Sequence, residues 1–467
     1  MPFAATGGLG DVMGSLPAAI AAADRYMDVR VVMPLYSAIS EKWRSQMTFE
    51  GNFDVMLAWR RQYCGVYSLV KDKVTYYFID NEFYFARDTL YGNFDDGERY
   101  AFFCKAAIDM LHHIAYYPDV IHAHDWQAAL SLVYLDTKYR HFGGYENIKT
   151  VFTIHNIEYQ GKYDLGILRD VFDLSDWDRH IVEYDGCINL MKGAIVCANK
   201  VSTVSPRYAD EIRTAEYAHG LERVLEENSY KLCGILNGID YDFYNPETNN
   251  GIAKKFSATS IADKYENKIA LQREIGLPEN ENIPIISVIS RLASHKGLDL
   301  ITEMVYNLMY ERDAQLVILG KGEAIYERFF TDLEAAFPEK VKALMTYDRD
   351  LANRIYAATD IFLMPSKSEP CGLSQMIASR YGAIPVTRET GGLYDSIKSY
   401  YEADGQIYGN GFTFFDYSAA VLRRRTDDAI DLWYDEEKRM SLVKKIMTTD
   451  FSWKASAVRY IEMYTSL

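Results

Sequence analysis

The sequence has no long run of hydrophobic residues. An α-helix needs roughly 18–20 uninterrupted apolar residues to span a bilayer, and no segment of the 467 residues approaches that length. The first residues, Met-Pro-Phe, also lack the charged and then apolar plan of a signal peptide. We therefore expect a cytoplasmic protein that has no membrane partner.

Cysteine and positive charge are both scarce. The six cysteines are scattered along the chain, without the short paired spacings that build zinc sites or redox centres. The 50 Lys and Arg residues are outnumbered by 66 Asp and Glu residues, which gives a formal net charge of −16. Because phosphate backbones are bound by clustered Lys and Arg, we expect no nucleic-acid partner. Any groups that bind an anion must therefore be a few side chains in one place rather than an extended basic surface.

The length indicates two domains, because single hydrophobic cores stop growing at about 250–300 residues. Short apolar runs alternate with helical patterns such as those over residues 98–113 and 127–139, which predicts the α/β class with parallel sheets. In the first half, strands are predicted at residues 29–34, 74–80, 119–124, 149–155, 200–204 and 234–236. In the second half, they are predicted at residues 285–290, 315–320, 343–346, 361–365, 383–386 and 411–414.

A polar, turn-rich segment separates the two halves. Residues 237–240 read Asn-Gly-Ile-Asp, and residues 245–251 contain only polar residues, Pro and Gly. We place the domain boundary there. In open α/β sheets, ligands bind beyond the carboxyl ends of the strands, so functional residues are expected directly after the predicted strands.

A glycine-rich segment, Thr-Gly-Gly-Leu-Gly-Asp at residues 6–11, precedes a predicted helix over residues 12–23. Glycines before a helix N-terminus let the backbone approach a phosphate group, whose charge the helix dipole favours. A plain turn is an equally good interpretation of this segment by itself.

Histidines follow two of the predicted strands. One strand ends in His122-Ala123-His124-Asp125-Trp126, and another ends in His155-Asn156. A histidine there can donate to a sugar hydroxyl, and its alternative is a core imidazole with one hydrogen bond. Three His and an Asp could suggest a metal site, but no helical HxxxH or HExxH spacing accompanies them, so no metal is expected.

Charged loops follow strands of the second half. Arg291 and Lys296 lie five residues apart before a predicted helix, where they can grip a diphosphate or remain solvated surface cations. Glu369 lies in Pro-Ser-Lys-Ser-Glu-Pro-Cys-Gly-Leu at residues 365–373, where a carboxylate can hold sugar hydroxyls or only favour the helix N-terminus. Two further glycine turns lie at residues 320–323 and 389–393.

Taken together, these motifs resemble the family of bacterial glycogen synthases and plant starch synthases. The match runs from residues 6–9 through 122–126, 153–156 and 235–240 to Glu-Pro-Cys-Gly-Leu at residues 369–373. The resemblance implies a GT-B fold, with two Rossmann-like doubly wound domains facing across a cleft. It also implies retaining transfer from ADP-glucose or UDP-glucose to a glycogen or maltooligosaccharide acceptor, without metal or cofactor. Bacterial relatives mostly favour ADP-glucose, so we expect that donor.

The resemblance also implies residue roles. Arg291 and Lys296 would bind the donor diphosphate, Glu369 would face the donor glucose, His155 would lie beside the reacting centre, and Asp125 would belong to the sugar-facing wall. Other donor-binding residues would be Gly7, Gly8, Asn237, Thr390, Gly391, Gly392 and Leu393.

The same resemblance assigns a role to each part of the chain. Residues 1–240 would form the acceptor-side domain, and residues 241–449 would form the nucleotide-sugar-binding domain. Residues 450–467 would form a terminal helix that returns to the first domain.

The chain departs from the family pattern in two places. Ala5 stands where the family carries a Lys, whose loss could cost about 2–4 kcal/mol of transition-state stabilisation. The family's first strand, about ten residues upstream of the glycine segment, is also missing. We expect a truncated or misassigned start, which a native mass above 53.6 kDa would support.

Two other functions compete with the synthase. One is a different GT-B enzyme, such as a phosphorylase or a sucrose-type synthase. The other is a catalytically weak glucan-binding regulatory paralogue, which Ala5 and the missing strand would fit. The joint presence of Arg291, Lys296, His155 and Glu369 favours the enzyme, because a binding module has no use for a full diphosphate grip.

Overall fold

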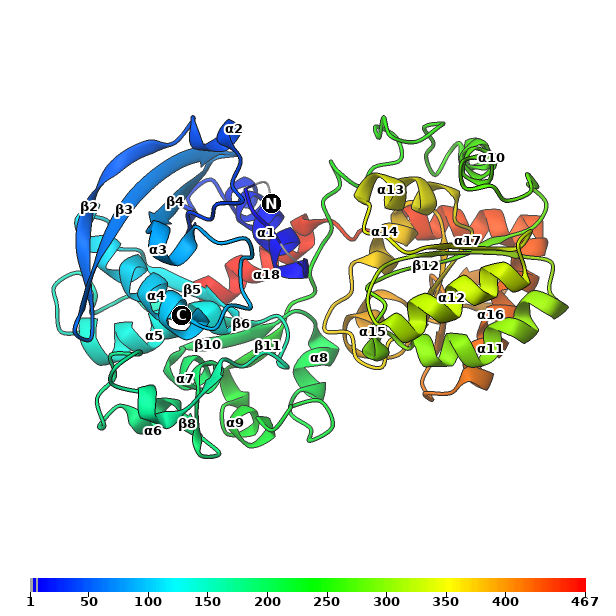
Figure 1. Cartoon of the computed structure of the whole chain (residues 1–467). Coiled ribbons are helices and arrows are strands. Elements are labelled where there is room, and N and C mark those ends of the chain that lie inside the picture. Colours follow the sequence, from blue (N-terminus) through cyan, green and yellow to red (C-terminus); the bar gives the residue numbers. More distant parts are fainter. Residues whose placement is uncertain (1–2, 6) are drawn as a thin grey trace. The chain divides into compact units, whose positions relative to one another are not determined.

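The computed structural model of the protein describes residues 3–5 and 7–467. Contacts within the chain divide it into two compact units (Figure 1). The first consists of Met1–Ile235 and Trp453–Leu467, and the second consists of Leu236–Ser452. Each unit therefore has its own core, and the last helix belongs to the unit that contains the start of the chain.

The first unit contains two four-stranded sheets. One consists of β1 (Arg30–Pro34), β2 (Thr48–Leu57), β3 (Arg60–Lys71) and β4 (Val74–Asp80), in the order β1-β4-β3-β2. In this sheet β1 is parallel to β4, and the other pairs are antiparallel. The other is parallel throughout, with the order β11-β10-β6-β5 and the strands β5 (Val120–His124), β6 (Lys149–Ile154), β10 (Lys200–Thr203) and β11 (Leu232–Gly234). All six strands predicted for this half are confirmed.

The hairpin β2–β3 was not predicted. Most residues of β2 are exposed or half-buried, and only Val55 and Leu57 are buried. The apolar runs that reveal parallel strands arise because such strands are covered on both faces, whereas an antiparallel hairpin can leave one face in water. Its mixed polar pattern therefore did not stand out from loop sequence.

Strands β1 and β5 end their sheets within the part of the chain that the structure describes. Both are mostly half-buried, although parallel strands are normally covered on both faces.

The helices of the first unit are α1 (Gly7–Ala23), α2 (Glu41–Arg44), α3 (Glu82–Phe85), α4 (Asp96–His113), α5 (Asp125–Tyr134), α6 (Arg179–Val182), α7 (Leu190–Cys197), α8 (Pro206–Glu211), α9 (Glu222–Glu227) and α18 (Trp453–Thr465). A small sheet adds β7 (Lys162–Tyr163), β8 (Glu183–Tyr184) and β9 (Cys187–Asn189).

Helix α1 begins at Gly7, so the prediction that the glycine segment only precedes the helix was wrong. Thr6 lies outside the described residues. The apolar faces of α1 and α18 share a buried cluster that includes Leu16, Trp453 and Tyr460.

The second unit is built on one parallel sheet with the order β14-β13-β12-β15-β16-β19. Its strands are β12 (Ile285–Ile289), β13 (Gln315–Leu319), β14 (Val341–Leu344), β15 (Ile361–Met364), β16 (Ile384–Arg388) and β19 (Phe412–Phe414), which confirms all six predictions. A hairpin of β17 (Tyr401–Ala403) and β18 (Gln406–Tyr408) stands apart. The helices are α10 (Lys264–Ile275), α11 (Leu298–Glu311), α12 (Ala324–Ala336), α13 (Arg349–Ala358), α14 (Ser374–Arg380), α15 (Gly391–Ser396), α16 (Ala419–Tyr434) and α17 (Glu436–Thr448).

A buried ion pair joins the amino ends of this sheet. Asp360 precedes β15, and its Oδ2 accepts hydrogen bonds from Lys268 Nζ and the Ile285 backbone N–H, both at 2.8 Å. The carbonyl oxygen of Asp360 also accepts from the Ile384 N–H at 2.8 Å. Residue Lys268 is completely buried, and Asp360 is 5% exposed. Helix α10 is thereby tied to the starts of three neighbouring strands.

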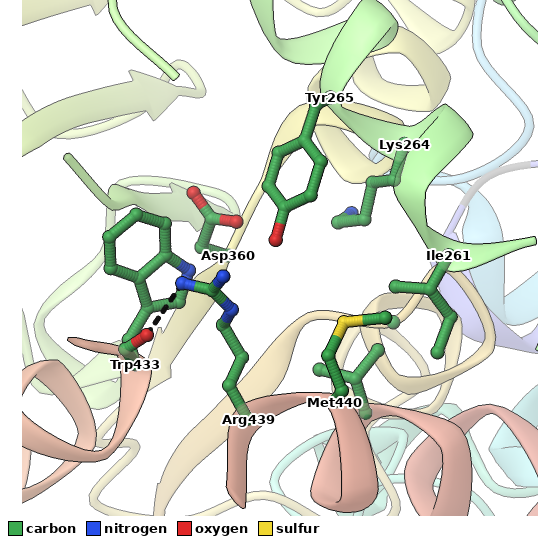
Figure 2. A pocket seen from close by; sticks show the side chains of 9 residues that line it. Ile261, Lys264, Tyr265, Asp360, Trp433, Arg439 and Met440 are labelled. Atoms are coloured by element: carbon green, nitrogen blue, oxygen red, sulfur yellow. Dashed lines mark hydrogen bonds between the residues drawn. The ribbon is translucent and has the colours of Figure 1, made fainter. Parts of the chain in front are cut away.

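A pocket borders this ion pair. Trp433 and Asp360 lie on one side of it and Ile261 on the other, and the guanidinium of Arg439 donates to the Trp433 carbonyl oxygen at 2.7 Å (Figure 2). The pocket adjoins the amino ends of the strands, whereas ligands of open α/β sheets bind at the carboxyl ends. We therefore regard it as part of the structural core of this unit.

Substitution Lys268→Met should destabilise the second unit, because it leaves the Asp360 carboxylate buried without its counter-ion. We expect a loss of about 3–5 kcal/mol in the free energy of unfolding, measured by urea titration. Adding Asp360→Asn, which keeps an acceptor for the Ile285 N–H, should recover at least half of that loss. Equal midpoints for Lys268→Met and the wild type would contradict the role of the pair.

Candidate active site

The candidate residues of the first unit meet at the carboxyl ends of β5 and β6. His124 ends β5, and His155 follows β6 directly. The two imidazoles are joined by a hydrogen bond of 2.9 Å between His124 Nδ1 and His155 Nε2. Burial lowers the pKa of His124 to about 4 and that of His155 well below its usual value, so both rings are neutral near pH 7. A neutral imidazole offers one donor and one acceptor, which suits hydroxyl groups.

Asp125 supports the backbone of this cluster. It adopts a left-handed conformation with φ 56° at the start of α5, and its Oδ1 accepts the His155 N–H at 2.7 Å. Such a conformation is uncommon for residues other than glycine, although Asp and Asn are enriched there. Burial raises the pKa of the Asp125 carboxyl to about 7, while hydrogen bonds from the His155 and Asn156 backbones oppose the shift. Its charge therefore changes near neutral pH.

A third histidine lies behind the first two. The ring of His122 stacks on that of His124, with 4.1 Å between the ring centroids. Its Nδ1 lies 2.8 Å from the Tyr464 hydroxyl, and its Nε2 lies 2.6 Å from Thr153 Oγ1. The C-terminal helix thus contributes a side chain to this edge of the sheet.

In the second unit, an ion pair joins the loops that follow β12 and β15. Lys296 Nζ donates to Glu369 Oε2 at 2.7 Å, and Ser366 Oγ donates to the same oxygen at 3.0 Å. The side chains of Lys296 and Glu369 are 18% and 9% exposed, respectively. The sequence predicted separate partners for these two charges. Without a ligand, each charge satisfies the other.

The two loops can meet because a glycine lies where they cross. Gly297, which follows Lys296, has φ +71°, and a Cβ atom there would lie 2.0 Å from the carbonyl oxygen of Pro365. The Lys367 N–H also donates to the carbonyl oxygen of His295 at 2.9 Å. Any side chain at residue 297 would separate the loops and stretch the ion pair.

The glycine turn that opens α15 packs against the Glu369 loop. A Cβ atom at Gly391 would lie 2.0 Å from the Glu369 carbonyl oxygen, and one at Gly392 would lie 2.1 Å from that of Cys371. The Gly392 N–H donates to the carbonyl oxygens of Glu369 and Pro370, at 3.1 and 3.2 Å. These glycines therefore permit close contact between the two segments, and the Gly392 N–H is engaged within the protein. Thr390 and Leu393 are buried in the same turn.

Asn237 reaches the same loop from the segment after β11. Its backbone hydrogen-bonds the Cys371 thiol, whose pKa burial raises to about 12. Residue Asn237 is 5% exposed, and its side-chain Oδ1 has no hydrogen-bond partner among the described residues. A buried carbonyl oxygen without a donor costs free energy, so a ligand donor would be favourable there.

Three predicted residues take part in none of the contacts described above. Arg291 is exposed, and its guanidinium forms no ion pair within the described part of the chain. Gly7 and Gly8 are exposed in the first turn of α1, and a Cβ atom at either would meet no atom within 4 Å. All three are open to solvent and available for contact with a ligand.

Two supporting residues were not predicted from the sequence. Ser366 lay within a quoted motif, and its position three residues before Glu369 was a local signal for the hydroxyl that accompanies the carboxylate. Tyr464 had no such signal, because it lies 342 residues from His122 along the chain. Only tertiary packing brings it to the histidines.

The two clusters offer complementary chemistry. The first presents neutral imidazoles and one carboxyl group, which can exchange hydrogen bonds with hydroxyl-rich molecules. The second presents one cation, one carboxylate and glycine turns, which can bind an anion beside a polar group that gains positive charge. In residues 3–5 and 7–467, no three His, Cys, Asp or Glu side chains are grouped as metal ligands, and no helix has the length and hydropathy of a bilayer span.

Two family models match the chain. The model described as the starch synthase catalytic domain matches residues 1–227, and the model described as glycosyl transferases group 1 matches residues 270–446. The boundary between the two matches falls in the segment that contains the start of the second unit.

Full-length relatives are similar to the entire chain. The glycogen synthase of Clostridium botulinum (strain Alaska E43 / Type E3) is 46% identical, over 100% of this chain and 97% of that protein. The glycogen synthase of Ligilactobacillus salivarius (strain UCC118) is 44% identical, over 100% of this chain and 98% of that protein.

Solved structures agree with this assignment. The catalytic domain of starch synthase IV from Arabidopsis thaliana, bound to ADP and acarbose, has a TM-score of 0.90 and 35% identity, covering 100% of this chain and 97% of that chain. Sucrose-phosphate synthase from Thermosynechococcus elongatus shares the fold, with a TM-score of 0.60 and 15% identity over 99% of this chain and 94% of that chain. The predicted GT-B fold of two Rossmann-like units is confirmed. With relatives of at least 44% identity along its whole length, the chain belongs to the family of glycogen and starch synthases, which are glycosyltransferases.

Proposed function

We propose that the protein is an ADP-glucose-dependent glycogen synthase, which transfers glucose to the non-reducing end of an α-1,4-glucan with retention of configuration. The observation that carries the proposal is the pair of Lys296 and Glu369 at the carboxyl ends of β12 and β15, where an open α/β sheet binds its ligand. The similarity to a starch synthase bound to ADP supports an adenine nucleotide. We place the protein in the cytoplasm.

On the donor side, breaking the bond between glucose and phosphate develops positive charge on the sugar and extra negative charge on the diphosphate. Arg291 and Lys296 would bind the diphosphate, and Glu369 would face the glucose. The ion pair with Glu369 fixes the position of the Lys296 ammonium group. The cation therefore lies beside the carboxylate that would face the glucose. Gly7, Gly8, Asn237, Thr390, Gly391, Gly392 and Leu393 would complete the donor site.

On the acceptor side, His155 would lie beside the reacting centre, and Asp125 would contact glucan hydroxyls. We favour same-face attack over a double displacement, because the sequence assigns no pair of carboxylates to a double displacement. In same-face attack the leaving phosphate accepts the proton of the incoming hydroxyl. We accordingly assign residues 1–240 to the acceptor and 241–449 to the nucleotide sugar, and the packing of α18 on α1 supports the return of residues 450–467.

The function is tested by measuring incorporation of labelled glucose into glycogen from ADP-glucose and UDP-glucose in parallel, with EDTA present. We expect transfer from ADP-glucose at a rate well above that from UDP-glucose. Faster transfer from UDP-glucose would reverse the donor assignment. Binding of glycogen without transfer from either donor would favour the regulatory paralogue, which Ala5 also fits.

Glu369→Gln and Lys296→Met should each lower kcat by about a hundredfold to a thousandfold, the cost of removing one preorganised charge from a transition state. Lys367→Met provides the matched control, because Lys367 lies in the loop that carries Glu369 but has an exposed side chain. Its kcat should remain near that of the wild type. If the control loses as much activity as Lys296→Met, loop damage rather than a lost diphosphate contact explains the effect. Thermal unfolding identifies any variant that is misfolded.

Asp125→Asn tests the raised pKa of Asp125. A carboxyl whose pKa rises on folding is protonated in the folded state at pH values where the unfolded chain has already lost the proton. The wild type should therefore lose stability relative to Asp125→Asn as the pH rises from 4 to 7, by on the order of 3 kcal/mol. Thermal unfolding of both proteins at pH 4 and pH 7 measures this difference. Asn tolerates the same backbone conformation, and a difference that is constant with pH would refute the shift.

A further inference from the structure

The C-terminal helix reaches the histidine cluster through one side chain. The hydroxyl of Tyr464, near the end of α18, lies 2.8 Å from His122 Nδ1. On the opposite edge of the ring, His122 Nε2 lies 2.6 Å from Thr153 Oγ1, which in turn lies 2.5 Å from Ser202 Oγ. Both ring nitrogens of His122 are therefore engaged, and the ring cannot rotate without breaking a hydrogen bond.

These contacts hold the His122 ring from both edges in either tautomer. Burial and the neighbouring histidines keep its pKa well below the usual value, so the ring carries a single N–H. Burial also raises the pKa of Tyr464, so its hydroxyl keeps its proton. If the Tyr464 hydroxyl donates to Nδ1, then Nε2–H donates to Thr153 Oγ1 and the Thr153 hydroxyl donates to Ser202 Oγ. In the opposite tautomer all three hydrogen bonds run in the reverse direction, so the ring is held in the same place.

The orientation of His122 is passed on by stacking. The rings of His122 and His124 lie 4.1 Å apart with 30° between their planes, and His124 then hydrogen-bonds His155 at 2.9 Å. A rotation of the His122 ring would alter the surface on which the His124 ring rests. The hydrogen bond to His155 would lose its geometry as a result.

The helix that carries Tyr464 is firmly docked. Its buried residues Trp453, Tyr460 and Met463 belong to the apolar cluster that includes Leu16 of α1 and Val151 of β6. The Met463 sulfur also contacts Cys233 Sγ at 3.8 Å. Because the helix is held by apolar packing along its length, the Tyr464 hydroxyl need not hold it in place and is available to orient His122.

We propose that Tyr464 is a positioning residue for the transfer reaction, which orients His155 through His122 and His124. The proposal rests on the proposed function, in which His155 lies beside the reacting centre. It gives the terminal helix a part in the chemistry of the first unit, beyond covering apolar surface. Tyr464 itself touches neither donor nor acceptor in this scheme.

The alternative is that the bond between Tyr464 and His122 only adds stability. The two roles differ in what the substitution Tyr464→Phe changes, since it removes the hydroxyl and keeps the ring. A stabilising bond would change the unfolding midpoint and leave the histidines in place. A positioning bond would change kcat and the state of the imidazoles.

The test compares Tyr464→Phe with Tyr460→Phe. Tyr460 is the matched control, because it lies on the same helix and its ring faces the same imidazole at a centroid distance of 5.9 Å. For Tyr464→Phe we expect kcat to fall about three- to tenfold, the size of one neutral hydrogen bond, with the KM for ADP-glucose within about twofold. The side-chain ¹⁵N signals of His122 should shift, because Nδ1 loses its hydrogen-bond partner, and those of His155 should shift as well. Tyr460→Phe should leave kcat and the His155 signals unchanged.

The proposal is overturned if Tyr464→Phe keeps wild-type kcat, or if both variants lose kcat equally. Unchanged His155 signals in Tyr464→Phe would overturn it as well, whatever the activity. If the wild type transfers glucose from neither nucleotide sugar, the proposed function fails. The His155 signals then still decide whether Tyr464 orients that ring, so the two failures can be told apart.

Discussion

The carboxyl edge of the second sheet depends on the ion pair between Lys296 and Glu369. Both side chains are largely removed from water, and two such charges are tolerated only when each satisfies the other with good geometry. Their distance of 2.7 Å in turn depends on Gly297, which lets the two loops cross without a side chain between them. Both charges are thus paired and largely desolvated within the protein itself.

The histidine cluster of the first unit is buried without charge, in contrast to the ion pair of the second unit. His122, His124 and His155 lie together without a counter-ion, and burial keeps all three neutral. Neutral rings can still exchange hydrogen bonds: His124 shares one with His155, and His122 is held by the Tyr464 hydroxyl, while Asp125 Oδ1 accepts the backbone N–H of His155. A charged partner would instead have fixed these groups as ions. The two units therefore supply different chemistry, charge in one and oriented hydrogen bonds in the other.

General rules of protein folding explain why most of the architecture could be predicted from the sequence. Buried parallel strands must be apolar on both faces, so all twelve predicted strands appeared as short hydrophobic runs, and each is present. The hairpin β2–β3 escaped prediction because most residues of β2 are exposed or half-buried, and such a mixed polar pattern resembles loop sequence. The start of α1 was also misplaced, since glycines weaken a helix in general and here lie in its first turn.

The amino-acid sequence by itself determined the fold class, the order of the elements and the residues that follow the strands, because these depend on local hydrophobic patterns and on short motifs. Only the tertiary structure decided which of those residues meet. It joined Lys296 to Glu369 rather than leaving them apart, engaged the Gly392 N–H within the protein, and brought Tyr464 to His122. The physical reason is that such contacts depend on distances between segments far apart in the chain, which are set by how helices and sheets pack and leave no trace in local sequence.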